Sequence, residues 1–156
     1  MIGDILLESY SLIWRMYENG FEVITVEEWS RGDIQYLVPA RLYYHALETA
    51  DFYMQNSKEF EWGYYCGVSP EEATQETLPS KEKMREYHEL VKEMITDRLS
   101  SISDADLFAP ETVFIWTGKT HLSRYLYLLS HYRQHIGEVN AELRHRGLDR
   151  IKWTTF

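Results

Sequence analysis

Two histidines, His131 and His135, stand four residues apart in the segment SHYRQHIGEVN. Residues four apart on an α-helix are neighbours on one face, with Cβ atoms roughly 5–6 Å apart, so two imidazoles at this spacing can bind one metal ion. A third histidine, His45, lies in an earlier segment with helical spacing. Three imidazoles leave coordination positions open for water or substrate, which is typical of a reactive metal site rather than a structural one. The histidines therefore predict a metal site without identifying its substrate.

Each of these histidines also has an interpretation without a metal. At 100° per residue, His131, His135 and Glu138 fall within about 60° of one another, away from the expected apolar stripe, so they could lie on a solvated face. His45 could be a core histidine bonded to a backbone carbonyl or a carboxylate. Its position on the apolar side of a helix favours the metal hypothesis, which requires the face of His131 and His135 to look into a cleft. A zincin protease is not supported, because Tyr132 stands where HExxH has its glutamate.

Carboxylates and hydroxyls near the three histidines are candidates for supporting roles. Glu138 could be an outer-sphere carboxylate, a general base and thus a catalytic residue, a fourth ligand, or an ordinary exposed glutamate. Glu48 and Tyr44, beside His45, are candidates for the outer sphere of the metal.

The remaining titratable candidates are explained more simply. We expect His88 to be a packing residue, His121 to cap a helix or face solvent, and His145 to suit a helix C-terminus. Cys66 is better explained as a small buried hydrophobic residue than as a nucleophile, because no Cys-His pairing can be inferred from the spacing.

Length and composition predict one domain, residues 1–156, with a real hydrophobic core. The net charge of −9 and the absence of a long Lys/Arg run disfavour nucleic-acid binding. A single cysteine excludes an intramolecular disulfide. The first residues lack the basic lead of a signal peptide and no apolar run approaches bilayer length, so we expect no membrane association and a cytoplasmic location. The 12 Tyr, 5 Trp and 6 Phe favour a thick core, a lined pocket or a subunit interface.

Four stretches have helical periodicity. The first runs from about Asp4 to Glu18 and is expected to end at Asn19-Gly20, the second runs from Pro39 to about Met54, and the third follows Ser80, its expected N-cap, to about Ile102. The fourth runs from about Thr120 to Arg146, with Gly147 closing it. Its expected buried stripe consists of Leu122, Leu126, Leu129, Ile136 and Leu143.

Two connections are long for a simple bundle. Residues Phe21 to Val38 include the β-prone EVITV and could hold a short helix or a strand-like pass. Residues Gln55 to Leu78 are expected to wrap the outside and could cover a cleft. Their aromatic residues Trp62, Tyr64 and Tyr65 are candidates for shaping a substrate pocket.

The order of these segments resembles the DinB-like (DinB/YfiT) superfamily of metal-dependent enzymes. The resemblance rests on the histidine within VPARLYYHALETADFY, on a third helix after LPSKEKMREYHELV, and on HLSRYLYLLSHYRQHIGEVNAELRHRGL, which is similar to the HxxxHxG segment of that superfamily. It covers nearly the whole chain. The motifs are short, and their joint order is more specific than any one of them.

The resemblance implies an all-α, up-down-down-up four-helix bundle that binds a divalent metal, often nickel or zinc, through His45, His131 and His135. Iron is also compatible with imidazole ligands. The resemblance further implies frequent homodimers. The family pattern often has Gln after the glycine of HxxxHxG, whereas this chain has Glu138, which leaves the role of that residue open.

Characterised relatives in the superfamily include thiol-dependent transferases and isomerases that use bacillithiol, mycothiol or glutathione. We therefore expect a metal-dependent enzyme acting on a small molecule, either an S-transferase that uses a low-molecular-weight thiol or a hydrolase. The alternatives are a non-catalytic small-molecule-binding or stress-response helical module, and a metal sensor. A cleft blocked by aromatic side chains would favour the non-catalytic module.

Overall fold

A computed structural model describes residues 1–155, and within them the protein is all-helical, with one isolated β-bridge between Pro110 and Thr120 and no strand. These residues form six α-helices and two short 3-10 helices. The α-helices are α1 (Ile2–Val23), α2 (Val26–Trp29), α3 (Pro39–Met54), α4 (Lys81–Ser101), α5 (Asp104–Leu107) and α6 (His121–His145). The 3-10 helices are η1 (Gln35–Leu37) and η2 (Ile115–Thr117).

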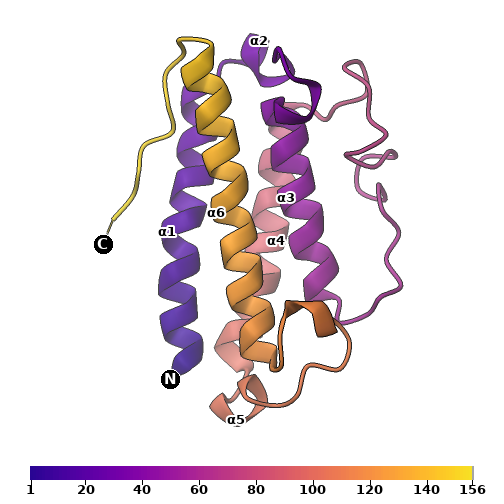
Figure 1. Ribbon diagram of the computed structural model, residues 1–156, viewed down its shortest axis with the longest axis vertical. Coiled ribbons are helices and arrows are strands. Elements are labelled where there is room, and N and C mark those ends of the chain that lie inside the picture. Colours follow the sequence, from indigo (N-terminus) through magenta and orange to yellow (C-terminus); the bar gives the residue numbers. More distant parts are fainter. Residues whose placement is uncertain (156) are drawn as a thin grey trace.

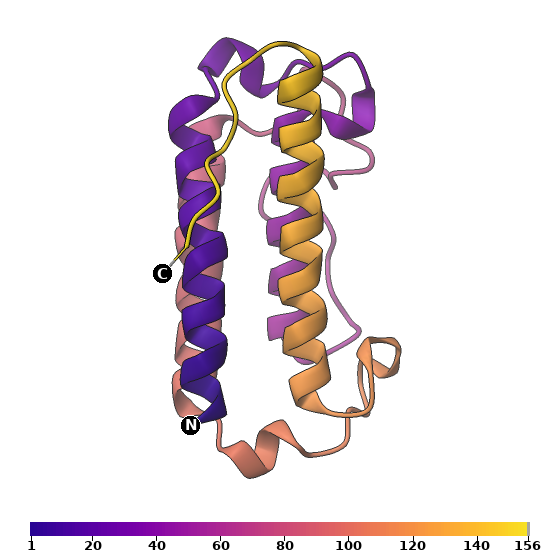
Figure 2. The ribbon, with the colours of Figure 1, turned by 60° about the vertical axis from the view of Figure 1, so that its left-hand side comes forward.

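The long helices α1, α3, α4 and α6 lie side by side (Figures 1 and 2). Helices α1 and α3 each contact both α4 and α6. Much of the aromatic content is in the core between them, where the hydroxyls of Tyr10 and Tyr17 have backbone partners. Tyr10 donates to the carbonyl of Tyr125 at 2.7 Å and Tyr17 to that of Tyr132 at 3.2 Å. These bonds join α1 to α6 across the core. They also satisfy two buried hydroxyls that would otherwise be costly to bury.

The predicted end of the first helix is wrong, because α1 continues through Asn19-Gly20 to Val23. Gly20 is buried, and a Cβ at this position would collide with the hydroxyl of Tyr43 and lie 2.9 Å from Cδ1 of Ile151. The glycine therefore permits close approach of α3 and the C-terminal segment rather than ending the helix. A sequence pattern cannot distinguish these two uses of glycine.

The predicted stripe of the fourth helix is wrong in its N-terminal half. Leu126 is 48% exposed, and Leu122 and Leu129 are only half-buried. Leu128 and Tyr132 are instead fully buried. The buried face of α6 consists mainly of Tyr125, Leu128, Tyr132, Ile136, Val139 and Leu143. The leucine spacing alone selected the wrong face, because aromatic residues supply part of the buried face: the ring of Tyr132 packs edge-on against Tyr10 and Tyr17.

The second and third helices agree with their predicted bounds. Pro39 is the first residue of α3, where its missing N–H costs no helical hydrogen bond. The N-cap of α4 is Ser80, whose Oγ accepts a hydrogen bond from the backbone N–H of Lys83 at 3.1 Å. The predicted stripe of α4 is buried from Met84 to Leu99, and Ile102 at its end is half-buried.

The two long connections contain little regular structure. Residues 24–38 include α2, capped by the side chain of Thr25, and η1, so a short helix is present there and EVITV forms no strand. Residues 55–78 contain no helix and run along the outer side of α3 (Figure 1). Buried carboxylates of α3 hold this connection: Glu48 accepts from the backbone N–H of Gly63 at 2.5 Å, and Asp51 accepts from the hydroxyl of Tyr64.

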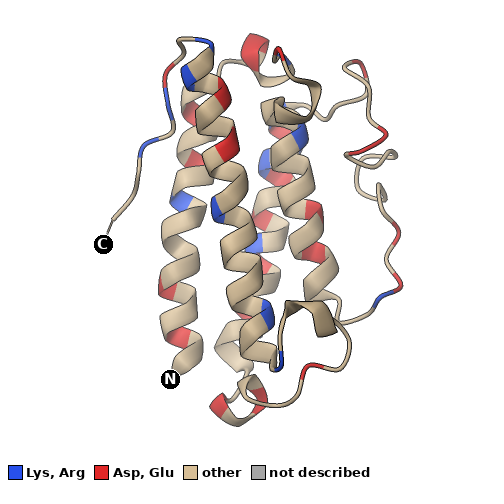
Figure 3. Ribbon diagram, viewed as in Figure 1, with Lys and Arg blue, Asp and Glu red and all other residues tan. Residues whose placement is uncertain are grey.

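Lys and Arg residues are dispersed among Asp and Glu along the helices rather than gathered on one of them (Figure 3). Within residues 1–155, no helix has both the length and the apolar character needed to cross a membrane.

Candidate metal centre

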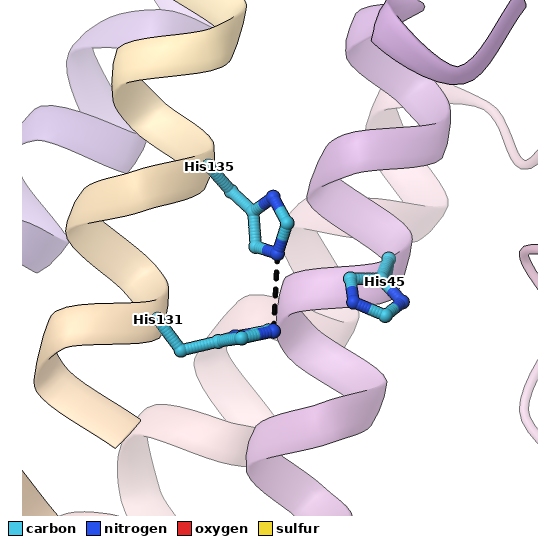
Figure 4. Close-up of side chains that lie close together, drawn as sticks. All are labelled: His45, His131 and His135. Atoms are coloured by element: carbon cyan, nitrogen blue, oxygen red, sulfur yellow. Dashed lines mark hydrogen bonds between the residues drawn. The ribbon is translucent and has the colours of Figure 1, made fainter. Parts of the chain in front are cut away.

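The structure brings together the three predicted histidines, His45 from α3 and His131 and His135 from α6 (Figure 4). Each ring offers one nitrogen, and these three atoms all lie within 4.8 Å of one another. The Nε2 atoms of His131 and His135 are 3.0 Å apart. Two ligand atoms bound at about 2.0–2.1 Å in a tetrahedral zinc site are separated by about 3.3 Å, so the pair is close to the separation that a shared cation requires.

The true buried face of α6 explains why these histidines meet α3. At 100° per residue, His135 lies only about 20° from Leu128 and His131 about 60° from it on the same side. Leu128 is fully buried, His135 is 8% exposed and His131 is half-buried. The histidines therefore lie at the edge of the core, where α6 contacts α3, rather than on a solvated face.

Two carboxylates hold the outer nitrogens of the rings. Oε2 of Glu138 is 2.6 Å from Nδ1 of His135, and Oε1 of Glu71 is 3.1 Å from Nδ1 of His45. A carboxylate on Nδ1 fixes the ring orientation and leaves the lone pair on Nε2, which is the usual support of a metal-binding histidine. This geometry matches the outer-sphere role among those considered for Glu138.

The predicted supporting roles of Tyr44 and Glu48 are not seen in the hydrogen bonds of residues 1–155. Tyr44 donates to the carbonyl of Val68 at 2.8 Å, and Glu48 accepts from Gly63 and from Tyr44. Burial raises the pKa of Glu48 to about 7, with the Gly63 N–H acting in the opposite direction. Both residues belong to the attachment of the 55–78 connection rather than to the histidine cluster.

The surroundings favour the neutral form of two of the three imidazoles, those of His131 and His135. Burial, together with the neighbouring His135 and His45, lowers the pKa of His131 to about 3. Burial also lowers the pKa of His135, although Glu138 acts in the opposite direction. Neutral imidazoles are the form that binds metal ions, so His131 and His135 need to lose no proton near neutral pH. Nδ1 of His131 is buried without a hydrogen-bond partner in residues 1–155, so the protein alone does not satisfy this ring.

A cleft of about 470 Å³ is lined by two of the three histidines, His45 and His135. Trp62, Tyr64 and Tyr65 are not among the described residues that line it, so their predicted role in shaping the pocket is wrong. Trp62 packs on Phe52 with ring centroids 5.1 Å apart, and Tyr65 stacks on Tyr87. The cleft is lined by Gln35, Tyr36, Arg41, Leu42, His45, Pro70, Glu71, His135 and Glu138.

A second cluster, Glu18, His88 and Glu89, also has its ligand atoms within 4.8 Å of one another. It already contains a cation, because Nζ of Lys92 is 2.6 Å from Oε1 of Glu18 and 3.7 Å from Oε2 of Glu89. His88 and Lys92 lower the pKa of Glu18 to about 2. His88 is buried and stacks on Tyr17, in agreement with its predicted packing role. We therefore assign this cluster to packing and ion pairing.

The other predicted residues lie apart from the histidine cluster. His121 is the first residue of α6 and its Nδ1 is 2.9 Å from the carbonyl of Asp106, whereas Thr120 caps the helix. His145 is the last residue of α6. Cys66 is half-buried rather than buried, and burial raises the pKa of its thiol, so the structure gives no activated thiolate there.

Two residues of the cleft were missed by sequence reasoning. Glu71 belongs to the acidic turn after Pro70, and only its proximity in space connects it with His45. Arg41 precedes His45 by four residues, so helical spacing alone could have placed it on the same face.

The donor set fits a divalent transition metal: three imidazoles, two of them supported by carboxylates, beside a cleft. Comparison of the chain with protein-family models, with curated proteins and with solved structures finds no match.

Proposed function

We propose that this protein is a DinB-like metal-dependent enzyme, in which His45, His131 and His135 hold one divalent metal ion beside a small-molecule cleft. The observation that carries the proposal is the convergence of three imidazoles from two helices at the edge of a cleft of about 470 Å³. Zinc and nickel are the proposed metals, and iron is compatible with the same ligands.

An up-down-down-up four-helix bundle is part of this proposal. It is supported by the course of the chain in Figure 1, where α1 and α6 begin near one end of the molecule and α3 and α4 begin near the other. The pairwise contacts of α1 and α3 with both α4 and α6 are compatible with this order.

The protein groups have separable roles in the proposed site. Glu138 and Glu71 orient the rings of His135 and His45 through their Nδ1 atoms. Leu42 and Pro70 supply apolar walls to the cleft. A divalent cation, when bound, supplies Lewis acidity that favours the deprotonated form of a water molecule or a thiol.

We propose thiol-dependent group transfer to a small electrophile as the reaction, with hydrolysis as the other outcome that the same site supports. The choice of transfer rests on the family resemblance. The cleft favours an enzyme over a non-catalytic module, because Tyr36 is the one aromatic residue among its described lining residues and is 68% exposed. A cytoplasmic homodimer without nucleic-acid or membrane partners is proposed on the sequence alone.

Turnover with simple thiols tests the proposal. Protein stripped with a chelator and reloaded with zinc or nickel is assayed with bacillithiol, mycothiol, glutathione and 2-mercaptoethanol against a chloroaromatic acceptor. We expect thioether formation that depends on the metal, is lost in His135→Ala and is retained in His121→Ala. The two variants are matched, because both remove a histidine from α6 and only the first lies in the cluster. Silence with every thiol in the metal-loaded protein would contradict the transferase proposal.

A further inference from the structure

Arg41 is a buried cation without a carboxylate partner. Its side chain is 8% exposed, and within residues 1–155 no carboxylate oxygen lies within 4.0 Å of its guanidinium nitrogens. Nε donates to the carbonyl of Gln35 at 3.1 Å, and the two terminal nitrogens donate to the carbonyls of Pro70 and Ala73. A guanidinium has five N–H donors, so two remain after these three bonds. Carbonyl dipoles do not neutralise the charge, and a buried charge is strongly stabilised by an ion of opposite sign.

The position of Arg41 puts this charge beside the histidine cluster. Arg41 precedes His45 by one helical turn of α3 and lines the same cleft. It also lines an adjoining pocket of about 530 Å³, and Gln35 is the other residue that the two cavities share. A ligand in the cleft can therefore reach both the cluster and the guanidinium.

The charges of the cleft favour an anion when a metal ion is bound. Glu71 and Glu138 contribute two negative charges beside the histidines. A divalent cation together with Arg41 outweighs them by one positive charge. Leu42 and Pro70 give another part of the cleft an apolar wall.

We infer that Arg41 binds the carboxylate of a small organic acid whose apolar part lies against Leu42 and Pro70, beside the metal site. This inference rests on the proposed function, because it assigns a substrate class to the same cleft. Arginine suits this role, because its planar fork pairs with both oxygens of a carboxylate. The competing explanation is purely architectural: Arg41 fastens the segments around Gln35 and Pro70 to α3 and binds no ligand.

Two probes of the same shape, one with a carboxylate and one with a neutral amide, distinguish these explanations. Isothermal titration calorimetry of the zinc-loaded protein compares 3-phenylpropionate with 3-phenylpropanamide. We expect the acid to bind about ten- to hundredfold more tightly than the amide, because hydrogen bonds to a charged group contribute about 1.5–3 kcal/mol. Arg41→Gln should abolish this preference. Arg31→Gln is the matched control, since Arg31 lines the adjoining pocket but is paired with Glu27 at 2.8 Å, and it should keep the preference.

Zinc content, measured on every sample, separates the two proposals. One zinc per chain with equal affinity for acid and amide in the unmodified protein overturns the role of Arg41 and leaves the metal site intact. A preference that persists in Arg41→Gln also overturns it, because the carboxylate is then held by the metal. Failure of the unmodified protein to bind zinc contradicts the proposed function instead. If Arg41→Gln does not fold, Arg41→Lys keeps the charge without the fork and should show a reduced preference.

Discussion

At the proposed metal site, metal affinity should depend on the carboxylate that contacts the outer nitrogen of His135. Glu138 contacts Nδ1 of His135 at 2.6 Å, and removing such a partner typically weakens metal binding about 10–100-fold. We predict that Glu138→Gln lowers zinc affinity by this factor, measured by competition with a chromophoric chelator. Glu93→Gln, on the exposed side of α4, is the control and should bind zinc normally. Equal affinity in the two variants would show that the Glu138 contact has no supporting role.

Glu48 should make stability depend on pH. Burial raises its pKa from 4.5 to about 7 in the folded protein, so folding favours the protonated form. Its stabilising contribution is fully present below about pH 4.5 and is lost as pH rises to about 7, by about 1–2 kcal/mol once solvent screening is included. Glu48→Gln removes this titration. We predict that urea unfolding at pH 5 and pH 8 shows a larger loss of stability in the unmodified protein than in the variant; parallel losses would contradict the assignment.

The residues of the cluster differ in how far sequence could predict them. His131 and His135 were predictable as neighbours because helical spacing determines which side chains share a face. The meeting with His45 was predicted from its apolar position and the family resemblance. Glu71 could not be predicted, because its contact with His45 depends on the path of the 55–78 connection, which has no periodicity. The assignment of catalysis to Glu138 stays a prediction.

At the scale of elements, local capping chemistry determines where α4 begins. The hydroxyl of Ser80 accepts from the N–H of Lys83, which has no partner within the helix. We predict that Ser80→Ala lowers the free energy of unfolding by about 1 kcal/mol in urea titrations. Ser130→Ala, at an exposed position within α6, is the control and should change stability by less, because alanine is favoured inside helices. A similar loss in both variants would argue against the cap.

Helix existence was predictable from local pattern, but two features of the helices depended on tertiary contacts. The predicted end of α1 was wrong, because Gly20 makes room for the side chain of Tyr43 instead of ending the helix. The prediction of the buried face of α6 was wrong, because Tyr132 is buried and the predicted Leu126 is exposed. The error in the buried face of α6 mattered for the site. The face that is buried in the structure lies close to His131 and His135, so the packing of α6 on α3 brings both histidines next to α3 and no second buried face of α6 is needed.

At the scale of the whole molecule, the side-by-side packing of α3 and α6 converts a sequence pattern into a site. From their spacing alone, His131 and His135 could lie on a solvated face or bind a metal ion as a pair. The packed helices bring three ring nitrogens within 4.8 Å of one another and leave a cleft beside them. The packing of the helices does not determine the reaction, the identity of the metal or the oligomeric state, which are therefore proposed separately.

The most direct test of the account is the metal content of the purified protein, measured by elemental analysis on the unmodified chain and on single alanine variants. We predict about one divalent transition metal ion per chain. The variants His45→Ala, His131→Ala and His135→Ala should lose most of it, whereas His121→Ala should retain it. Equal metal content in all five proteins, or none in the unmodified chain after incubation with zinc or nickel, would contradict the three-histidine site.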